Sequence, residues 1–283
     1  MEAIQDVMKK LPMNTGSVCN YEPGMSERMK AETANSENGK LNQKDGYDCQ
    51  ICRNKGYIIR AVEENGFWRI VAQECQCMKI RRTIRRMEKS GLKNLMRDYT
   101  FGKFEVSENW QKTVQNAAAS YAKSPQGWFF IGGQSGCGKT HICTAICREL
   151  ILQGLDVVYM LWRGEITRLK AMVTDVDKYD NNIQLFKRAE VLYIDDFFKM
   201  GRGVGNNDIQ KPTMADINIA FELLNYRSIN NLQTIISSEF NIAELLEIDQ
   251  ALAGRIVENA NPMPIVIRPD IKKNYRLKKV GEI

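Results

Sequence analysis

The sequence predicts an α/β protein in which a parallel sheet is flanked by helices and preceded by a small cysteine-rich module. Three observations predict this class. Apolar strand-like runs alternate with helical runs from residue 127 to residue 267, a glycine-rich loop ends in Lys139-Thr140, and two close pairs of cysteines lie upstream. Such alternation places helices on both faces of a parallel sheet and a ligand at the carboxyl ends of its strands.

Composition narrows the class of protein further. The chain has 283 residues, with 40 Lys+Arg against 34 Asp+Glu and a formal net charge of +6. This positive charge excludes an acidic, disordered chain, and a hydrophobic content of 43% is enough for at least one core. No apolar run approaches the ~18 residues of a membrane span, and the first residues lack the pattern of a signal peptide. We therefore expect a cytoplasmic protein with no membrane partner and with two unequal domains.

The first 95 residues are expected to form an N-terminal region distinct from a second domain over residues 96–283. Residues 1–47 predict a short helix followed by a polar tether, because Met25–Asp45 offers no apolar period. Residues 78–94 predict a basic helix with an apolar stripe, so most of its charge faces solvent. A dedicated nucleic-acid contact on this helix is the less favoured alternative.

Four of the eight cysteines form two close pairs: Cys49 with Cys52, and Cys75 with Cys77. Between the pairs, strand-like runs at 56–62 and 67–72 flank an Asn65-Gly66 turn signal, so a hairpin would return the second pair to the first. Four converging thiolates make a tetrahedral Zn²⁺ site, and the metal would stabilise a module of about residues 47–78 that is too small for much core. Buried or redox-active thiols are the alternative.

The strongest motif is a phosphate-binding loop. Residues 133–140, Gly-Gln-Ser-Gly-Cys-Gly-Lys-Thr, fit G-x-x-x-x-G-K-[ST] between a strand-like run at 127–131 and a helical run at 140–153. Backbone N–H groups would wrap a phosphate at the helix N-terminus, while Lys139 reaches the β/γ-phosphates and the Thr140 hydroxyl ligates Mg²⁺. A glycine-rich turn that binds nothing is the alternative. The predicted nucleotide-binding residues are Gly133, Ser135, Gly136, Cys137, Gly138, Lys139, Thr140 and His141.

An acidic pair follows a second buried strand. After the apolar run at 191–194, Asp195 would hold Mg²⁺ and Asp196 would polarise the attacking water. A glycine-rich loop is expected directly afterwards, at Lys199–Lys211. The remaining elements are expected as strands at 156–161, 233–237 and 264–267, and as helices within 163–188, 213–229 and 242–247.

With these residues assembled, the chain resembles the AAA+ ATPases, specifically the bacterial and phage helicase loaders of the DnaC/DnaI type. Beyond the P-loop, the resemblance rests on Tyr99–Phe104, Ile194–Lys199, Asn225–Arg227, Ala253–Ile256 and Asn274–Leu277. It implies an AAA+ ATPase with ATP, Mg²⁺ and Zn²⁺ as cofactors. It also implies a hexameric replicative helicase and single-stranded DNA as partners, and a homo-oligomer when assembled.

The resemblance also assigns individual residues and exposes two departures. It implies that Arg255 is an arginine finger, with Arg227 a weaker candidate, although without the family Arg255 would be read as an ion-pair partner of a nearby Glu. Most AAA+ proteins place Glu where Asp196 stands. Ser237-Ser238-Glu239 replaces the Ser-Asn of many relatives, so the γ-phosphate sensor stays unassigned. Both departures suit a slow switch.

Several functional alternatives remain open. Basic and aromatic residues near the C-terminus predict a single-stranded DNA contact, with an idle solvated tail as the alternative. They are Lys272, Lys273, Tyr275, Arg276, Lys278 and Lys279. A transposition helper of the IstB type is the nearest rival to the loader, followed by a nucleotide-binding adaptor that does not turn over. A small-molecule kinase fits less well, because kinase lid cysteines follow the P-loop instead of preceding it.

Overall fold

The computed structural model describes residues 24–89, 93–200 and 211–278. The chain divides into two compact units, Met1–Cys75 and Gln76–Ile283. The expected N-terminal helix before residue 24, the glycines of the expected loop after Lys199, and Lys279 lie outside the described residues. The functional boundary expected at residue 95 stays a prediction, and by packing the basic helix belongs to the second unit.

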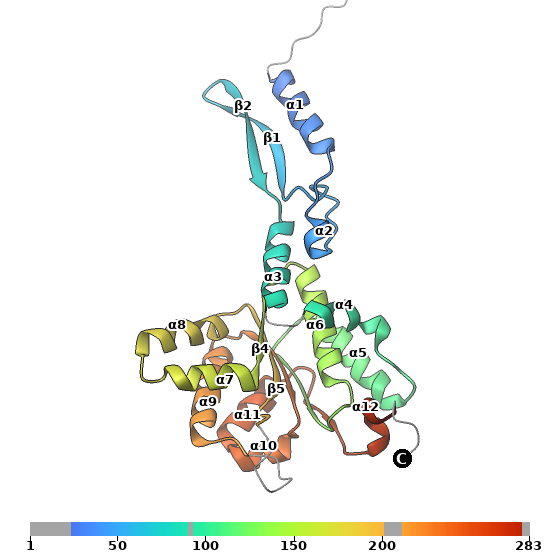
Figure 1. The fold of residues 1–283 in the computed structure, drawn as a ribbon, viewed down its shortest axis with the longest axis vertical. Coiled ribbons are helices and arrows are strands. Elements are labelled where there is room, and N and C mark those ends of the chain that lie inside the picture. The colour runs from blue at the N-terminus through green and yellow to red at the C-terminus, as the bar shows by residue number, and fades with distance from the viewer. Residues whose placement is uncertain (1–23, 90–92, 201–210, 279–283) are drawn as a thin grey trace, which may run out of the picture. The chain divides into compact units, whose positions relative to one another are not determined.

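The first unit is a helix packed on a two-stranded hairpin (Figure 1). Its elements are α1 (Met25–Ser36), α2 (Asn42–Asp45), β1 (Tyr57–Glu64) and β2 (Phe67–Glu74). The strands pair antiparallel, with Glu64 opposite Phe67, so the turn consists of two residues. Asn65 and Gly66 adopt φ of 54° and 80°, the left-handed conformation that such a two-residue turn requires. The hairpin predicted from the sequence is confirmed.

The tether predicted over Met25–Asp45 is wrong, because this segment is largely helical. Contacts with the hairpin stabilise the helix α1, although its sequence has no apolar period. Asn35 donates from Nδ2 to the Ile59 carbonyl at 2.8 Å and accepts from the Ile59 N–H at 2.9 Å, which ties α1 to β1. Ala31 is buried and the Arg28 guanidinium lies 4.7 Å from the centroid of the Trp68 ring. One small apolar residue and a paired amide therefore hold a helix whose own periodicity is weak.

The second unit contains a five-stranded parallel sheet with strand order β4-β5-β6-β3-β7. The strands are β3 (Trp128–Gly133), β4 (Val157–Leu161), β5 (Val191–Phe197), β6 (Gln233–Ser238) and β7 (Ile265–Ile267). The longer helices are α3 (Cys77–Lys89), α5 (Asn109–Lys123), α6 (Lys139–Leu152), α7 (Trp162–Met172), α8 (Val176–Lys187), α9 (Met214–Ile229) and α11 (Gln250–Asn259). The short ones are α4 (Lys93–Asp98), α10 (Ile242–Ile248), α12 (Tyr275–Lys278) and the 3-10 turns η1 (Phe101–Lys103) and η2 (Ile271–Lys273).

Helices cover both faces of this sheet, as predicted. In Figure 1, α5 and α6 lie on one side of the strands, and α7 to α11 lie on the other. Every residue of β3 is buried, as expected for a central strand covered twice. The expected helix over 78–94 is two helices, α3 and α4, and α5 was not predicted. Among the described residues, none of the helices combines the length and apolar character that crossing a bilayer demands.

Candidate functional site

The loop between β3 and α6 has the shape of a phosphate cradle. Gly133, Gly136 and Gly138 have φ of 101°, 73° and 94°, a conformation that favours glycine. A Cβ at Gly136 would lie 2.1 Å from Asn274 Oδ1, so the C-terminal segment also requires glycine there. The loop ends at the N-terminus of α6, where unpaired N–H groups and the helix dipole attract anions.

Lys139 is held inside this loop. Its Nζ donates to the carbonyls of Gly133 at 2.7 Å and Gln134 at 2.8 Å, and only 6% of the residue is exposed. Burial lowers the pKa of Lys139 from its ordinary value. The thiol of Cys137 donates to the same Gln134 carbonyl at 2.8 Å. The loop therefore positions a buried amine among backbone dipoles, in the place where a polyphosphate would be bound.

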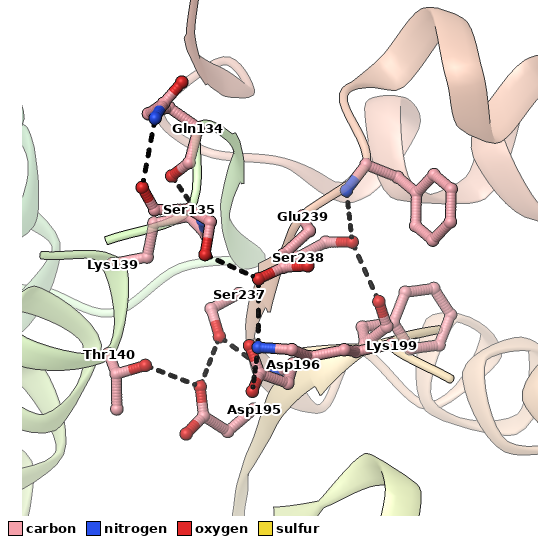
Figure 2. Close-up of polar contacts among 12 residues, drawn as sticks. Gln134, Ser135, Lys139, Thr140, Asp195, Asp196, Lys199, Ser237, Ser238 and Glu239 are labelled. Carbon is pink, nitrogen blue, oxygen red and sulfur yellow. Dashed lines mark hydrogen bonds and ion pairs between the residues drawn. The ribbon is translucent and has the colours of Figure 1, made fainter. Parts of the chain in front are cut away.

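Asp195 joins the phosphate loop to the end of β5. Thr140 Oγ1 donates to Asp195 Oδ1 at 3.2 Å, so the two motifs predicted to share one metal ion are in hydrogen-bond contact (Figure 2). Ser237 on β6 donates to the same oxygen at 2.5 Å, and Tyr193 donates to it at 2.7 Å. A hydroxyl and a carboxylate at this position are oxygen ligands of the kind Mg²⁺ prefers. Thr140 and Asp195 are therefore fit to hold that ion.

Asp196, the next residue, has a strained backbone conformation. Its φ is 54°, which is uncommon outside glycine, and its N–H donates to Ser237 Oγ at 3.2 Å. Its Oδ2 lies 3.1 Å from Lys199 Nζ. Burial, and next the charge of Asp195, raise the pKa of Asp196. A carboxylate with a raised pKa beside a phosphate loop is suited to accept a proton from water.

Two charged residues of the site were not predicted. Glu239 accepts from Ser135 Oγ at 2.8 Å and lies 2.9 Å from Lys199 Nζ. Burial alone would raise the pKa of Glu239, but hydrogen bonds from Lys199 and Ser135 outweigh it and lower that pKa. The sequence offered a signal for both residues, because Lys199 follows the acidic strand and Glu239 ends the next one. Neither matches a general nucleotide-binding pattern, so only the fold brings them together.

Many of these groups line one cavity of about 450 Å³, although Asp195 is not among the described residues of its wall. Its wall contains most of the predicted nucleotide-binding set, with Asp196, Lys199 and Glu239 on the acidic side. His141 and Tyr99 stack at 4.6 Å between ring centroids, and Phe104 meets His141 edge-on at 5.3 Å. Burial lowers the pKa of His141. The aromatic rings suit a nucleobase, and Lys139 with the glycine-rich loop of the same cavity suits its phosphates.

The basic C-terminal segment contacts the phosphate loop. Tyr275 donates its N–H to the Gly136 carbonyl at 2.9 Å, and its hydroxyl accepts from Gln111 Nε2. Lys273 Nζ lies 5.8 Å from the centroid of the Trp110 ring, and Arg276 lines the cavity. The described part of this segment therefore packs against the site through Tyr275, while Lys272 and Arg276 are exposed, and a DNA contact by its basic residues stays a prediction.

The two arginine candidates lie away from the cavity. Arg255 is on α11, with its guanidinium 5.2 Å from the centroid of the Phe221 ring, and it is not among the described residues that line the cavity. Arg227 is fully buried and donates to the carbonyls of Phe186 and Ala189, both at 2.9 Å, as well as to neighbouring groups. Its guanidinium holds the sheet to α8, so an arginine finger at Arg227 does not fit the structure.

The four paired cysteines form one buried cluster. The sulfur atoms of Cys49, Cys52, Cys75 and Cys77 all lie within 4.8 Å of one another. The Cys49 and Cys75 sulfurs are 3.8 Å apart, which matches the ~3.8 Å edge of a tetrahedron with Zn–S distances near 2.3 Å. Gly56 donates its N–H to Cys52 Sγ at 3.3 Å, a bond that favours the thiolate. The cluster is compatible with Zn²⁺.

Comparisons with known proteins agree with this geometry. Residues 63–261 match the family of IstB-like ATP-binding proteins. The phage-like element PBSX protein XkdC of Bacillus subtilis (strain 168) is 30% identical, covering 83% of this chain and 88% of its own. The replicative helicase loader DnaC of Escherichia coli (strain K12) is 33% identical over 89 residues, which are 30% of this chain and 35% of DnaC.

A solved structure supports the fold. The crystal structure of the DnaC helicase loader superposes with a TM-score of 0.52 at 16% identity, covering 62% of this chain and 98% of that one. Identity this low establishes the architecture alone. The second unit therefore has the α/β fold of an AAA+ P-loop NTPase, as the sequence predicted.

Proposed function

The chain belongs to the family of IstB-like ATP-binding proteins, and from this premise we propose that it is an ATP-dependent loader of a replicative DNA helicase. It would place the hexameric helicase on single-stranded DNA, with ATP binding and hydrolysis switching between assembly and release. One observation carries the proposal: Thr140 of the phosphate loop contacts Asp195 of β5 at 3.2 Å. This contact brings the loop and the acidic strand end to a single site.

Each residue of the site would have a separate role in ATP hydrolysis. Lys139 would contact the β- and γ-phosphates, and Thr140 and Asp195 would hold Mg²⁺, which neutralises the charge that develops on the phosphates. Asp196 would orient the attacking water and accept its proton. Because Asp is one methylene shorter than Glu, we expect slow turnover, which suits a switch more than a motor.

Loading is supported by similarity and by the first unit. The stretch shared with DnaC at 33% identity and the DnaC-like fold both favour a replication partner. The cysteine cluster, holding Zn²⁺, would keep the N-terminal region in shape to grip the helicase. The basic segment that includes Lys272, Lys273 and Arg276 would contact single-stranded DNA through phosphates and Tyr275.

Assembly would complete the site. Arg255 lies outside the cavity of its own chain, as expected for a residue that reaches the γ-phosphate bound by a neighbouring copy. We therefore propose that hydrolysis depends on a homo-oligomer. Arg255→Ala would then lower turnover in the assembled state and leave ATP affinity of the isolated chain unchanged.

Native mass spectrometry of the chain with a candidate hexameric helicase, with and without ATP, tests the proposal. A nucleotide-dependent complex is expected, and a mixture that never associates would contradict loading. Phosphate release measured with helicase and single-stranded DNA separates a turning-over loader from an adaptor, since the adaptor would release none.

The family match favours one second candidate. IstB-like proteins share the ATP-binding domain of this chain, so a transposition helper that remodels a transposase on duplex DNA fits the second unit equally well. The cysteine cluster is the feature that favours the loader. Parallel pull-downs with a hexameric helicase and with a transposase distinguish the two roles by which partner is retained.

A further inference from the structure

Lys199 brings a positive charge to the acidic side of the cavity. Its Nζ lies between Asp196 Oδ2 at 3.1 Å and Glu239 Oε1 at 2.9 Å. Glu239 in turn accepts from Ser135 of the phosphate loop at 2.8 Å (Figure 2). One ammonium group therefore connects the carboxylate that would activate water to a carboxylate that touches the loop.

The backbone around Lys199 is fixed by buried aromatic residues. Phe197 and Phe198 are fully buried and stack at 4.1 Å between ring centroids, and both rings also pack on Trp162. Phe198 has a φ of 61°, and the Lys199 N–H donates to the Asp196 carbonyl at 2.9 Å. A strained turn held by packing is a common device for aiming functional side chains. Here the turn directs Asp196 and Lys199 to the same place.

The end of β6 fixes the other partner. Ser238 Oγ donates to the Phe197 carbonyl at 2.8 Å and accepts from the Phe240 N–H at 3.1 Å. Glu239 lies between these two anchored residues. The Lys199–Glu239 pair therefore spans two rigid strand ends next to the phosphate loop.

The negative charges around Lys199 determine which group its ammonium contacts when a nucleotide binds. Asp196 and Glu239 both line the cavity, and each carboxylate would repel a γ-phosphate placed against the loop. Lys199 supplies the charge that offsets this repulsion. Its long, partly exposed side chain can turn from the carboxylates to the phosphate while its backbone stays in place.

We propose that Lys199 is a catalytic residue of ATP hydrolysis, a cation supplied within the chain that contacts the γ-phosphate. This inference rests on the proposed ATPase function. When ATP binds, the ammonium leaves Asp196 for the γ-phosphate oxygens and so frees the carboxylate. The oxygen of water then bonds to the γ-phosphorus as the bond from phosphorus to the β–γ bridging oxygen breaks. ADP leaves with that electron pair, and the proton of the water passes to Asp196.

The test compares Lys199→Met, Lys199→Arg and the control Lys178→Met. Lys178 makes the same i,i+3 contact with an aspartate, Asp175, on the exposed surface of α8. With Mg²⁺ and ATP, Lys199→Met should lower kcat about 100-fold, the effect of removing one preorganised donor to the transition state. Its affinity for ATPγS should fall while its affinity for ADP, which has no γ-phosphate, stays unchanged. Lys199→Arg should retain most of the activity, and Lys178→Met all of it.

The outcomes separate this inference from the proposed function. If the wild type hydrolyses ATP and Lys199→Met has the same kcat, the inference is wrong and the loader proposal is untouched. If Lys199→Met loses ADP affinity in parallel with ATPγS affinity, the lysine acts on the shape of the site and the inference is also wrong. A wild type that hydrolyses ATP without engaging a helicase would contradict loading and leave the Lys199 result valid.

Discussion

The two units of this protein differ in how much of each is buried. In β1 and β2 none of the strand residues is buried, and the buried side chains of this unit include Ala31, Cys49, Cys52 and Cys75. In β3 every residue is buried, and the core around it extends across the sheet and its helices. A small unit with so little core would need a chemical crosslink, whereas the larger unit has an extended core of its own. We therefore expect the first unit to be sensitive to metal removal, and the second to changes in its interior.

Loss of a bound metal should give the largest effect, and we expect it to fall mainly on the hairpin. We expect Cys52→Ser to lose the bound zinc and to unfold the hairpin, because structural Zn²⁺ contributes about 10–16 kcal/mol in small zinc domains. Zinc analysis together with hydrogen exchange over β1 and β2 would measure both, and ATP affinity should not change. Cys147→Ala is the matched control, since Cys147 is buried in α6 and is not one of the four clustered cysteines. If Cys52→Ser retained its zinc, the proposal that the four cysteines bind the ion would be wrong.

Arg227→Met should produce the converse result. It removes donors from carbonyls that include those of Phe186 and Ala189 and leaves them buried without partners. Each such group costs about 1–3 kcal/mol, so we expect a loss of about 3 kcal/mol or more in the urea unfolding of the second unit. Zinc content should stay the same. Arg168→Met, at an exposed ion pair with Glu165, should change stability by less than about 0.5 kcal/mol. Equal effects of the two substitutions would exclude a buried clamp.

The sequence predicted the second unit better than the first because buried elements leave stronger sequence patterns than exposed ones. Strands buried on both faces and a helix after Thr140 leave strong local patterns, so the sheet and the meeting of Thr140 with Asp195 could be foreseen. The helix α1 could not, because a single buried alanine and the Asn35 amide hold it through contacts with β1. The Lys199–Glu239 pair also depends on two strand ends that are distant in sequence. No local pattern records such a contact.

Asp216 should reveal how the interior of the second unit depends on pH. Its carboxylate is fully buried, 2.7 Å from Lys170 Nζ, and it accepts from the Thr213 N–H at 2.8 Å at the start of α9. Burial would raise the pKa of Asp216, but these hydrogen bonds outweigh it and hold the folded pKa below the ordinary 3.8. Its stabilisation is thus present above the unfolded pKa and is lost as the pH falls through the folded pKa.

We expect Asp216→Asn to lower stability at pH 7 by about 1.5–3 kcal/mol, as for a hydrogen bond to a charged group. The difference from the wild type should shrink as both proteins are taken below about pH 4, where Asp216 of the unfolded wild-type chain begins to protonate. Urea titrations at several pH values would measure it, with Asp175→Asn at an exposed helix start as the control. A difference that stays constant with pH would mean that shape, not charge, matters at Asp216.

The smallest effect should come from the hairpin. Phe67 is 78% exposed at the start of β2, directly after the Asn65-Gly66 turn. Replacing it with Ser removes an aromatic ring that is already in water, so the free energy of unfolding of the first unit should change by no more than about 0.5 kcal/mol. Thermal unfolding of the zinc-loaded protein would measure this change. A loss above about 1 kcal/mol would show that Phe67 is buried in solution. In that case the first unit would have a core of its own, and the contrast between a metal-held and a core-held unit would be wrong.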